Sequence, residues 1–391
     1  MTDVDVLIIG GGAMGLSTAW QLARRGRRVR LLEQFQPGHH MGASHGATRN
    51  FNTSYTQPDL VAMLHESRSL WNELELDSGR QILDLVGLVN HGPGAASPDA
   101  HAAISAGGEA AELLSTKDAG ERWPGIRFDT EVLHLPRAGR VRAADALTSM
   151  AELAAASGAE LSWGKRAVSV IEEADRVVVE AHSWGEAPEH RGHARETITA
   201  KVVVSAVNAW TRTLLGGSVE LPRMRVTQEA PVHFREFNGY IDWPSFNHLP
   251  ALGRAGYEGW LSPVYGMLTP GEGIKAGWHG VGPVVDPDAR DFLPVRAQLD
   301  AIIQYARDWL PGVDAESAEP ISCTYTTTDD ARFVIDRVGR IVVLAGFAGE
   351  GFKFVPSIGR LGADLAENGP GAAPELFSLS RPRSIAGEPL R

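Results

Sequence analysis

Several features are scarce in this sequence, and cysteine is the first. Cys323 is the only cysteine among 391 residues, so an intramolecular disulfide is excluded and a reducing compartment is favoured. The first residues, Met-Thr-Asp-Val-Asp, lack the basic, apolar and small-residue segments of a secretory signal. No uncharged apolar stretch approaches the length of a transmembrane helix. We therefore expect a cytoplasmic protein that does not associate with a membrane.

Positive charge is also in short supply. The chain has 37 Lys and Arg against 48 Asp and Glu, which gives a formal net charge of −11, and no basic stripe is visible. Nucleic acid and anionic membranes are therefore not expected as partners. A zinc pattern is lacking too, because the spacing of His182, His190 and His193 matches no standard zinc motif. We expect the segment from His182 to Glu196 to be an exposed hairpin loop, and we expect no metal site.

The length favours two packed domains rather than one ordinary core. Segments typical of buried parallel strands and their helices occur at the start, in the middle and at the end of the chain. The stretch from Leu221 to Trp309 differs, because it is rich in Trp, Tyr, Pro and Gly, as mixed sheets with binding loops are. We predict an α/β fold (α+β overall), with a discontinuous Rossmann-like dinucleotide-binding domain at 1–85, 140–220 and 322–391. A substrate domain with a mixed sheet is inserted at 86–139 and 221–321.

The expected elements follow from hydrophobic spacing. Strands are predicted at Val4 to Ile9, Val29 to Glu33, Ala167 to Ile171, Arg176 to Glu180, Lys201 to Val207, Arg225 to Val232, Gly273 to Trp278 and Arg340 to Ala345. Helices are predicted at Ala13 to Arg25, at Ala144 to Ala156, and after Gly351 through Leu365. The tail after Glu367 is rich in Pro and Gly, and we expect it to be loosely packed.

The first strand runs into Gly10-Gly11-Gly12-Ala13-Met14-Gly15, which satisfies the G-x-G-x-x-G pattern. Gly10 permits the tight turn, Gly12 lets the backbone approach a pyrophosphate, and Gly15 lets the helix pack on the strand. The helix start, at Ala13 and Met14, offers backbone N–H groups to phosphate. Glu33 ends the next strand, where a carboxylate can accept hydrogen bonds from a ribose. We predict a dinucleotide site, which could hold FAD or NAD; a packing turn without a ligand is the alternative.

Motifs along the whole chain resemble those of the D-amino-acid-oxidase-like flavoprotein superfamily, and within it the monomeric sarcosine oxidase and N-methyltryptophan oxidase group. They are Ser44-His45-Gly46-Ala47-Thr48-Arg49, Arg122-Trp123-Pro124-Gly125-Ile126, Val264-Tyr265-Gly266, Lys275-Ala276-Gly277-Trp278-His279, Cys323-Thr324-Tyr325-Thr326 and Gly351-Phe352-Lys353-Phe354. The segment from Phe352 to Pro356 also resembles the imino-acid oxidases of nikkomycin biosynthesis. The order and spacing of these pieces are more specific than any one of them. The resemblance implies that the dinucleotide is FAD.

The resemblance also implies roles for three residues far from the glycine turn. Cys323 stands where the related enzymes carry the flavin through a thioether to its 8α-methyl carbon, although a lone cysteine is more often inert and buried. Lys275 matches a lysine over the flavin that activates O₂, where a positive charge stabilises developing superoxide. Lys353 matches a lysine that holds the substrate carboxylate. Without the resemblance, the two lysines would be read as a surface residue on an edge strand and a helix-flanking residue.

Other positions have roles that the resemblance alone suggests. His45 and Arg49 match residues near the flavin ring, and Tyr265, His279 and Tyr325 match residues of the substrate cavity. Further cofactor contacts are expected from Ser44, Thr48, Gly349, Gly351 and Phe352. Glu350 occupies a variable position and is assigned no role. Asn52 stands where the related oxidases have an arginine that shares the substrate carboxylate, and an amide offers hydrogen bonds but no charge.

These residues together lead us to expect a flavin-dependent amine oxidase. A secondary amine, such as an N-methyl or cyclic amino acid or a derivative, would be oxidised to an imine, and O₂ would be reduced to H₂O₂. The substrate is then a small amine, the second substrate is O₂, and the protein is a monomer. Because of Asn52, simple sarcosine is not the expected substrate. The alternatives are a flavin dehydrogenase, a primary D-amino-acid or glycine oxidase, and a non-catalytic FAD-binding protein.

Overall fold

The structure is a computed structural model that describes residues 2–185, 192, 194–237, 243–253 and 257–382. Of the three histidines considered above, His190 and His193 lie outside the described residues. His182 lies within a strand and not in the predicted loop, because β11 (Val177–Ser183) pairs with β12 (Arg195–Ser205) in an antiparallel hairpin. The predicted loop is therefore shorter than expected at both ends.

One large sheet is parallel at its centre and carries the predicted dinucleotide motif. Four parallel pairings give the order β21-β12-β1-β2-β9, and the first strand, β1, runs in register beside β2 and β12. β-Branched and leucine side chains are buried on both faces of this sheet, as is usual for a parallel sheet covered on both sides. Its strands are β1 (Val4–Ile9), β2 (Val29–Glu33), β9 (Glu160–Trp163), β10 (Lys165–Glu172), β11, β12, β20 (Val334–Val338) and β21 (Ile341–Ala345).

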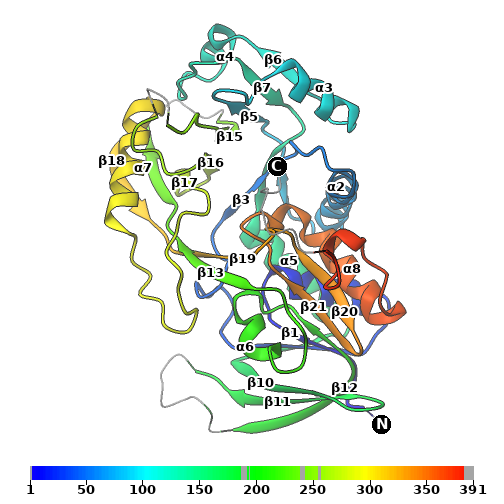
Figure 1. Ribbon diagram of the computed structural model, residues 1–391. Coiled ribbons are helices and arrows are strands. Elements are labelled where there is room, and N and C mark those ends of the chain that lie inside the picture. Colours follow the sequence, from blue (N-terminus) through cyan, green and yellow to red (C-terminus); the bar gives the residue numbers. More distant parts are fainter. Residues whose placement is uncertain (1, 186–191, 193, 238–242, 254–256, 383–391) are drawn as a thin grey trace.

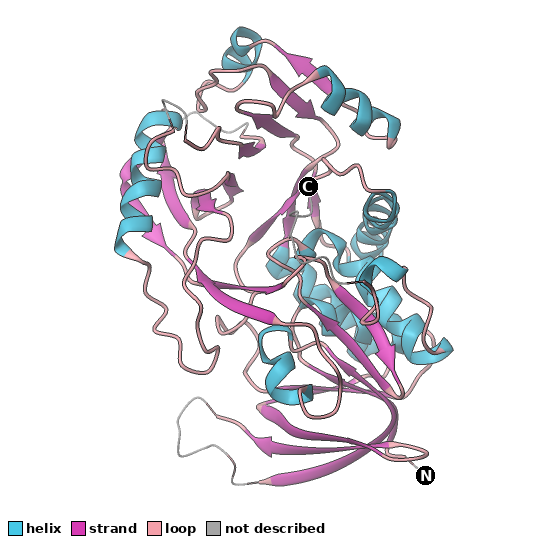
Figure 2. Ribbon diagram, in the orientation of Figure 1, coloured by secondary structure: helices cyan, strands magenta, loops and turns pink. Residues whose placement is uncertain are grey.

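Helices cover one face of this first sheet. Helix α1 packs against α5 and α8, and α2 packs against α8, so that their apolar sides form one core with the sheet. Figure 2 shows these helices gathered on the same side of the molecule. The helices of the structure are α1 (Ala13–Arg24), α2 (Pro58–Ser78), α3 (Pro98–Ala106), α4 (Thr116–Arg122), α5 (Ala143–Ala156), α6 (Thr211–Leu215), α7 (Arg296–Trp309) and α8 (Val355–Asn368), with short 3₁₀ turns η2 (Asn208–Trp210), η3 (Gly351–Phe354) and η4 (Glu375–Phe377).

A second large sheet has mixed strand directions and a core of its own. Its order is β18-β14-β17-β16-β15-β5-β7-β6, in which only the β15–β5 pair is parallel. Figure 1 shows it in the upper left of the molecule, with the first sheet below. Its strands are β5 (Leu88–His91), β6 (Glu112–Leu114), β7 (Val132–Leu135), β14 (Val232–Glu236), β15 (Ser245–His248), β16 (Val264–Thr269), β17 (Gly273–Trp278) and β18 (Val313–Pro320).

Two small sheets complete the fold. One has the order β3-β8-β4, formed by β3 (Thr48–Phe51), β8 (Gly139–Arg142) and β4 (Leu83–Asp84). The other pairs β13 (Met224–Glu229) with β19 (Cys323–Thr328) in an antiparallel ribbon. Because β3 and β19 carry several predicted site residues, these small sheets matter for the site.

The observed architecture confirms the predicted fold class: a Rossmann-like α/β sheet and a second, mixed sheet whose strands come from intervening parts of the chain. Strands of the second sheet fall at 88–135 and 232–320, while the first sheet draws its strands from 4–33, 160–205 and 334–345. The domain boundaries given above stay a prediction. Among the described residues, no helix combines the length and apolar character needed to cross a membrane.

Two further local predictions were wrong. The segment from Arg225 to Val232 is not one strand but two, β13 and β14, because Pro231 lacks the N–H that a continuing ladder requires. The tail is not loosely packed over its described part. Phe377 is fully buried, and Arg381 forms a buried ion pair with Asp330.

Candidate functional site

A cavity of about 1380 Å³ is lined by residues of both large sheets. It exceeds the roughly 300–1,000 Å³ of an ordinary small-molecule site. Every predicted site residue lines it except Gly15. The cavity therefore brings together residues from Gly10 to Lys353 that are hundreds of positions apart in the chain.

The glycine turn at the end of β1 leaves no room for side chains. Gly10 has φ +107°, and a Cβ there would lie 2.6 Å from the carbonyl oxygen of Ala206. A Cβ on Gly15 would lie 1.8 Å from the carbonyl oxygen of Gly10. Gly15 therefore allows α1 to pack against the turn, which is the packing role expected for it, and it does so from outside the cavity lining.

The residues around this turn are held by hydrogen bonds. The Gly11 N–H donates to Glu33 Oε2 at 2.6 Å, and the Phe35 N–H donates to Glu33 Oε1 at 2.9 Å. The hydroxyl of Ser44 accepts a hydrogen bond from the Ala13 N–H at 3.0 Å. Burial raises the pKa of Glu33, although these backbone donors oppose the shift. Glu33 is thereby fixed at the end of β2, where the ribose contact was predicted.

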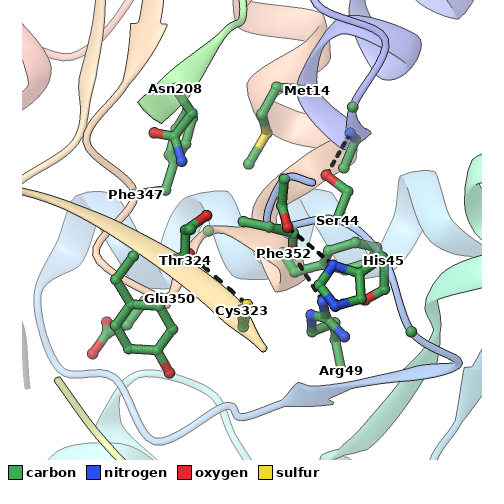
Figure 3. Close-up of a pocket in the computed structure, with 18 of the residues that line it drawn as sticks. Met14, Ser44, His45, Arg49, Asn208, Cys323, Thr324, Phe347, Glu350 and Phe352 are labelled. Carbon is green, nitrogen blue, oxygen red and sulfur yellow. Dashed lines mark hydrogen bonds between the residues drawn. The ribbon is translucent and has the colours of Figure 1, made fainter. Parts of the chain in front are cut away.

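Arg49, in β3, organises the loop that precedes it. Its guanidinium donates hydrogen bonds to the carbonyl oxygens of Ala43 and Thr48, at 2.8 and 2.9 Å, and to that of His45. It also lies 5.6 Å from the ring centroid of Phe352. Figure 3 shows His45, Arg49, Phe352 and Cys323 around one part of the cavity. Burial, followed by the charge of Arg49, lowers the pKa of His45 to about 3, so this imidazole is neutral.

Lys275 is not a surface lysine on an edge strand. It lies in β17, between β14 and β16, and is 3% exposed. Its Nζ donates a hydrogen bond to the carbonyl oxygen of Thr48 at 3.0 Å. Burial, and then the charge of Arg49, lower the pKa of Lys275 to about 7. A buried amine with a pKa near neutrality is typical of functional sites.

Cys323, at the start of β19, lines the same cavity and is partly exposed to it. Its Sγ lies 3.9 Å from the carbonyl oxygen of Thr324. Arg290 lies close enough for its charge to interact with Cys323. Cys323 therefore presents its thiol to the cavity beside a cationic side chain.

Lys353, in η3, belongs to a buried network that includes two residues without a predicted role. Its Nζ donates hydrogen bonds to the hydroxyl of Tyr55 at 3.0 Å and to the backbone carbonyl of Glu350 at 2.7 Å. The Tyr55 hydroxyl in turn donates to Glu350 Oε2 at 3.0 Å. Burial lowers the pKa of Lys353 to about 8, and the nearby Glu350 opposes that shift.

A pair of tyrosines stands beside this network. Tyr265 and Tyr325 are hydrogen-bonded to each other, and burial raises the pKa of both. The ring of Tyr325 lies 5.3 Å from that of His279 and packs on Gly349, where a Cβ would lie 2.3 Å from the Tyr325 ring. Both phenols therefore stay protonated and can serve as hydrogen-bond donors.

Asn52, three positions before Tyr55, also lines the cavity, but its amide oxygen is already engaged. It accepts hydrogen bonds from the N–H of Ser54 at 2.8 Å and from the Ser54 hydroxyl at 2.5 Å. Asn52 therefore contributes neither a charge nor a free acceptor. Its amide nitrogen is the group that it can offer to a substrate.

These residues fit a dinucleotide with a reactive ring. A cradle without Cβ atoms at Gly10 and Gly12 suits a pyrophosphate, and Glu33 suits a ribose. The far part of the cavity has the buried Lys275 and the thiol of Cys323.

Tyr55 and Glu350 were missed as site residues. Tyr55 has no sequence signal, but Glu350 is an acid between two glycines and three positions before Lys353, which could have drawn attention to it.

Comparison with known proteins finds FAD-dependent oxidoreductases. The model of the DAO family, described as FAD dependent oxidoreductase, matches residues 5–365. The monomeric sarcosine oxidase of Bacillus sp. (strain B-0618) is 28% identical over 397 residues, with 97% of each chain covered. The N-methyl-L-tryptophan oxidase of Salmonella dublin is 27% identical, with 93% of this chain and 94% of the relative covered. The solved structure of NikD, an unusual amino acid oxidase essential for nikkomycin biosynthesis, has a TM-score of 0.81 at 27% identity, covering 96% and 97% of the two chains.

Proposed function

Because the chain belongs to the FAD dependent oxidoreductase family, we propose that it is an amine oxidase that uses FAD and O₂. The substrate is a secondary amine, such as an N-methyl or cyclic amino acid or a derivative. The amine loses two electrons and two protons across its C–N bond and becomes an imine, and O₂ takes up two electrons and two protons and becomes H₂O₂. FAD supplies the two-electron chemistry that links these half-reactions. Two relatives named as oxidases of N-methyl amino acids support the substrate class.

The observation that carries the proposal is the buried Lys275 in the same cavity as the Lys353 network. A buried cation would be costly without a function. Beside Arg49 and hydrogen-bonded to Thr48, Lys275 can hold a positive charge where O₂ acquires electrons. This favours an oxidase over a dehydrogenase with another electron acceptor.

Several residues would hold the cofactor. The glycine turn and the start of α1 would bind the pyrophosphate, and Glu33 would bind the ribose. The backbone of Gly349, Gly351 and Phe352 would stabilise negative charge on the ring. Cys323 would attach the ring covalently through its thiol, which lines the cavity.

The substrate would bind between Lys353 and the two tyrosines. Tyr265 and Tyr325 remain protonated and can orient a polar group, and His279 packs beside them. The neutral state of His45 adds no positive charge against a bound amine. The burial that lowers the pKa of Lys275 and Lys353 would also lower the pKa of an amine bound beside them. The cavity therefore favours the neutral amine, which is the form that can be oxidised.

The Lys353 network also bears on the carboxylate end of the substrate. Glu350 places a carboxylate within the same hydrogen-bonded group as the Lys353 ammonium, and Asn52 adds no charge. A carboxylate in the substrate would then be attracted by Lys353 and repelled by Glu350. This arrangement favours a derivative without a free carboxylate, such as an ester or amide, or a larger amine.

The protein is further proposed to be a cytoplasmic monomer whose partners are the amine and O₂. The word monomeric in the name of the Bacillus relative supports the oligomeric state. Size-exclusion chromatography with light scattering would measure it directly.

A substrate screen tests the proposed function. Purified protein is incubated in air with N-methyl amino acids, cyclic imino acids, their esters and amides, and bulkier secondary amines, and H₂O₂ is measured. We expect peroxide with at least one secondary amine, and more with an ester or amide than with the matching acid. The absence of peroxide with every amine, from protein that contains its flavin, would contradict the proposal.

A further inference from the structure

A pair of histidines lies in the second sheet, on the face away from the candidate site. His91 is the last residue of β5 and His248 is the last residue of β15. The two strands are parallel neighbours, and these two residues are register partners. Side chains of register partners lie on the same face of a sheet. The two imidazole rings accordingly lie 3.8 Å apart, centroid to centroid.

Both histidines are fully buried, yet most of their nitrogens lack a partner. Each is 0% exposed, and within the described part of the chain neither nitrogen of His91 nor Nε2 of His248 has a hydrogen-bond partner. Their surroundings are aromatic, with contacts to Phe128, Trp260 and Trp309. Buried polar groups in proteins are almost always paired, so these nitrogens are available to bind a ligand.

Asp129 supplies an anionic group at the same place. One possible ligand atom from each of His91, His248 and Asp129 lies within 4.8 Å of the other two. Asp129 is exposed, and its Oδ2 accepts a hydrogen bond from the hydroxyl of Tyr257 at 3.5 Å. The pair of buried imidazoles therefore has one solvent-facing side that carries a carboxylate.

One of the two imidazoles has a hydrogen-bond partner that can orient it. The Nδ1 of His248 lies 3.4 Å from the Tyr305 hydroxyl, whose oxygen can accept a hydrogen bond from the Nδ1–H and leave Nε2 for a ligand.

We propose that His91, His248 and Asp129 form a binding site for a divalent transition metal, and that zinc is the metal they fit. Two imidazoles and one carboxylate, completed by water, are a common ligand set for tetrahedral zinc. Calcium and magnesium prefer all-oxygen ligands. Zinc–ligand bonds of about 2.0–2.1 Å place neighbouring ligand atoms about 3.4 Å apart, so atoms that lie within 4.8 Å of one another must close by at most about 1.4 Å. Asp129, exposed and outside any helix or strand, can make much of that movement.

The proposed metal site lies on the opposite face of the two strands from the cavity. The preceding residues of the two strands, Asn90 and Asn247, line the cavity, and Asn247 Nδ2 donates a hydrogen bond to Asn90 Oδ1 at 2.8 Å. Alternation along a strand directs them opposite to the histidines. A metal held by His91 and His248 would thus tie together the ends of the strands that form this wall. The proposed zinc site is separate from the site of amine oxidation.

The test measures zinc on the intact flavoprotein. The protein is treated with a chelator, dialysed against zinc sulfate, and analysed for bound zinc and for its melting temperature. We expect one tightly bound zinc per chain and a higher melting temperature with zinc. The spacing of histidines along the sequence indicated no metal site, so bound zinc would identify a site that only the fold creates.

Variants connect the zinc to these residues. Asp129→Asn should weaken zinc binding by about tenfold or more, and His91→Gln and His248→Gln should remove it. The exposed Asp175→Asn, in the β10–β11 turn, is the control and should bind as the wild type does. No bound zinc in the wild type, or equal affinity in Asp129→Asn and wild type, would overturn the proposal. If a histidine variant does not fold, the zinc affinity of Asp129→Asn still tests the proposal. Flavin content and amine oxidation are measured separately for each variant.

Discussion

The amine of Lys353 donates a hydrogen bond to the hydroxyl of Tyr55 at 3.0 Å, so the lysine proposed to bind substrate is already engaged in the protein. Tyr55 connects Lys353 to Glu350, because its own O–H donates a hydrogen bond to the Glu350 carboxylate. Burial and the Glu350 charge raise the pKa of Tyr55, which keeps it protonated as a bridge. The three side chains act as one unit that is close to neutral, and the consequences can be measured.

Removing the charge of Glu350 should strengthen the binding of carboxylates. Glu350→Gln keeps the shape and the hydrogen bond to Tyr55 but removes the repulsion of an anion. We expect acetate to bind about fivefold more tightly, equivalent to about 1 kcal/mol. The dissociation constant is measured from the change in the flavin spectrum. Glu272→Gln, which alters a carboxylate elsewhere in the cavity lining, should have a smaller effect; equal or weaker acetate binding by Glu350→Gln would contradict the account.

The pH dependence of the same binding follows from Lys353. Burial lowers its pKa to about 8, and above that pH the neutral amine no longer attracts an anion. Acetate affinity should therefore fall as the pH rises through about 8. In Glu350→Gln the opposing effect of the negative charge is lost, so the pKa falls further and affinity should decline at a lower pH. An affinity that does not change across this range would show that the Lys353 charge has no part in binding.

Lys275→Met should separate the two half-reactions. The cation is proposed to act on O₂, so we expect reoxidation by O₂ to slow by about a hundredfold or more. Anaerobic reduction by the amine should change by less than about tenfold. In the wild type, reoxidation should also slow as the pH rises through about 7, because that is the pKa of Lys275. Stopped-flow absorbance measures both reactions, with Lys165→Met as a control at another part of the cavity; unchanged reoxidation in Lys275→Met would contradict the assigned role.

Cys323→Ser should release the flavin. After precipitation of the wild type with acid, we expect the yellow colour to stay with the protein pellet, because a thioether resists acid. In the variant the colour should move to the supernatant. Free flavin in the wild-type supernatant would remove the proposed covalent bond while leaving the rest of the proposal intact.

The tail gives a prediction about stability. Arg381 donates to both carboxylate oxygens of Asp330, at 2.8 and 3.0 Å, in a buried pair. Arg381→Ala should lower the free energy of unfolding by about 3 kcal/mol, because it leaves a buried charge unpaired. Arg296→Ala breaks an exposed pair with Asp300 and should cost less than about 1 kcal/mol. Urea unfolding measures both, and a loss in Arg381→Ala no larger than that of the control would contradict the packing of the tail.

The pH dependence of this effect has a definite sign. Burial raises the pKa of Asp330, but hydrogen bonds from Arg381 and its neighbours outweigh this and lower it to about 2, from 3.8. The carboxylate therefore contributes stability above a pH of about 4, and the contribution is lost as the pH falls through about 2. The difference in the free energy of unfolding between wild type and Arg381→Ala should therefore become smaller as the pH falls over that range.

The parts of the fold that were predictable have local signals. Strand β1, the glycine turn and α1 are specified by β-branched residues, by glycines and by helical spacing, and their bounds agree with the structure to within a residue. The break at Pro231 was readable from the chemistry of proline but was overlooked. The packing of Arg381 was not readable, because Asp330 is 51 positions away and only the tertiary fold brings the two together.

The candidate site also has residues that the sequence predicted and contacts that only the fold reveals. A resemblance in short motifs singled out Lys275, Lys353 and Cys323, and the structure places all three in one cavity. It could not show that Lys353 is bonded to Tyr55, because Tyr55 lies 298 positions away and has no motif of its own. The metal ligands proposed here illustrate the same limit, since His91 and His248 become neighbours only when β5 pairs with β15.

The most direct test of the central claim is a single anaerobic mixing experiment followed by air. The protein is mixed with a secondary amine from the screen in the absence of O₂, and its visible flavin absorbance is followed. The account predicts that the colour bleaches with the formation of an imine, and that air restores the colour and yields one H₂O₂ for each flavin reduced. A flavin that no secondary amine bleaches, or a bleached flavin that air does not restore, would contradict the claim that this protein is an amine oxidase.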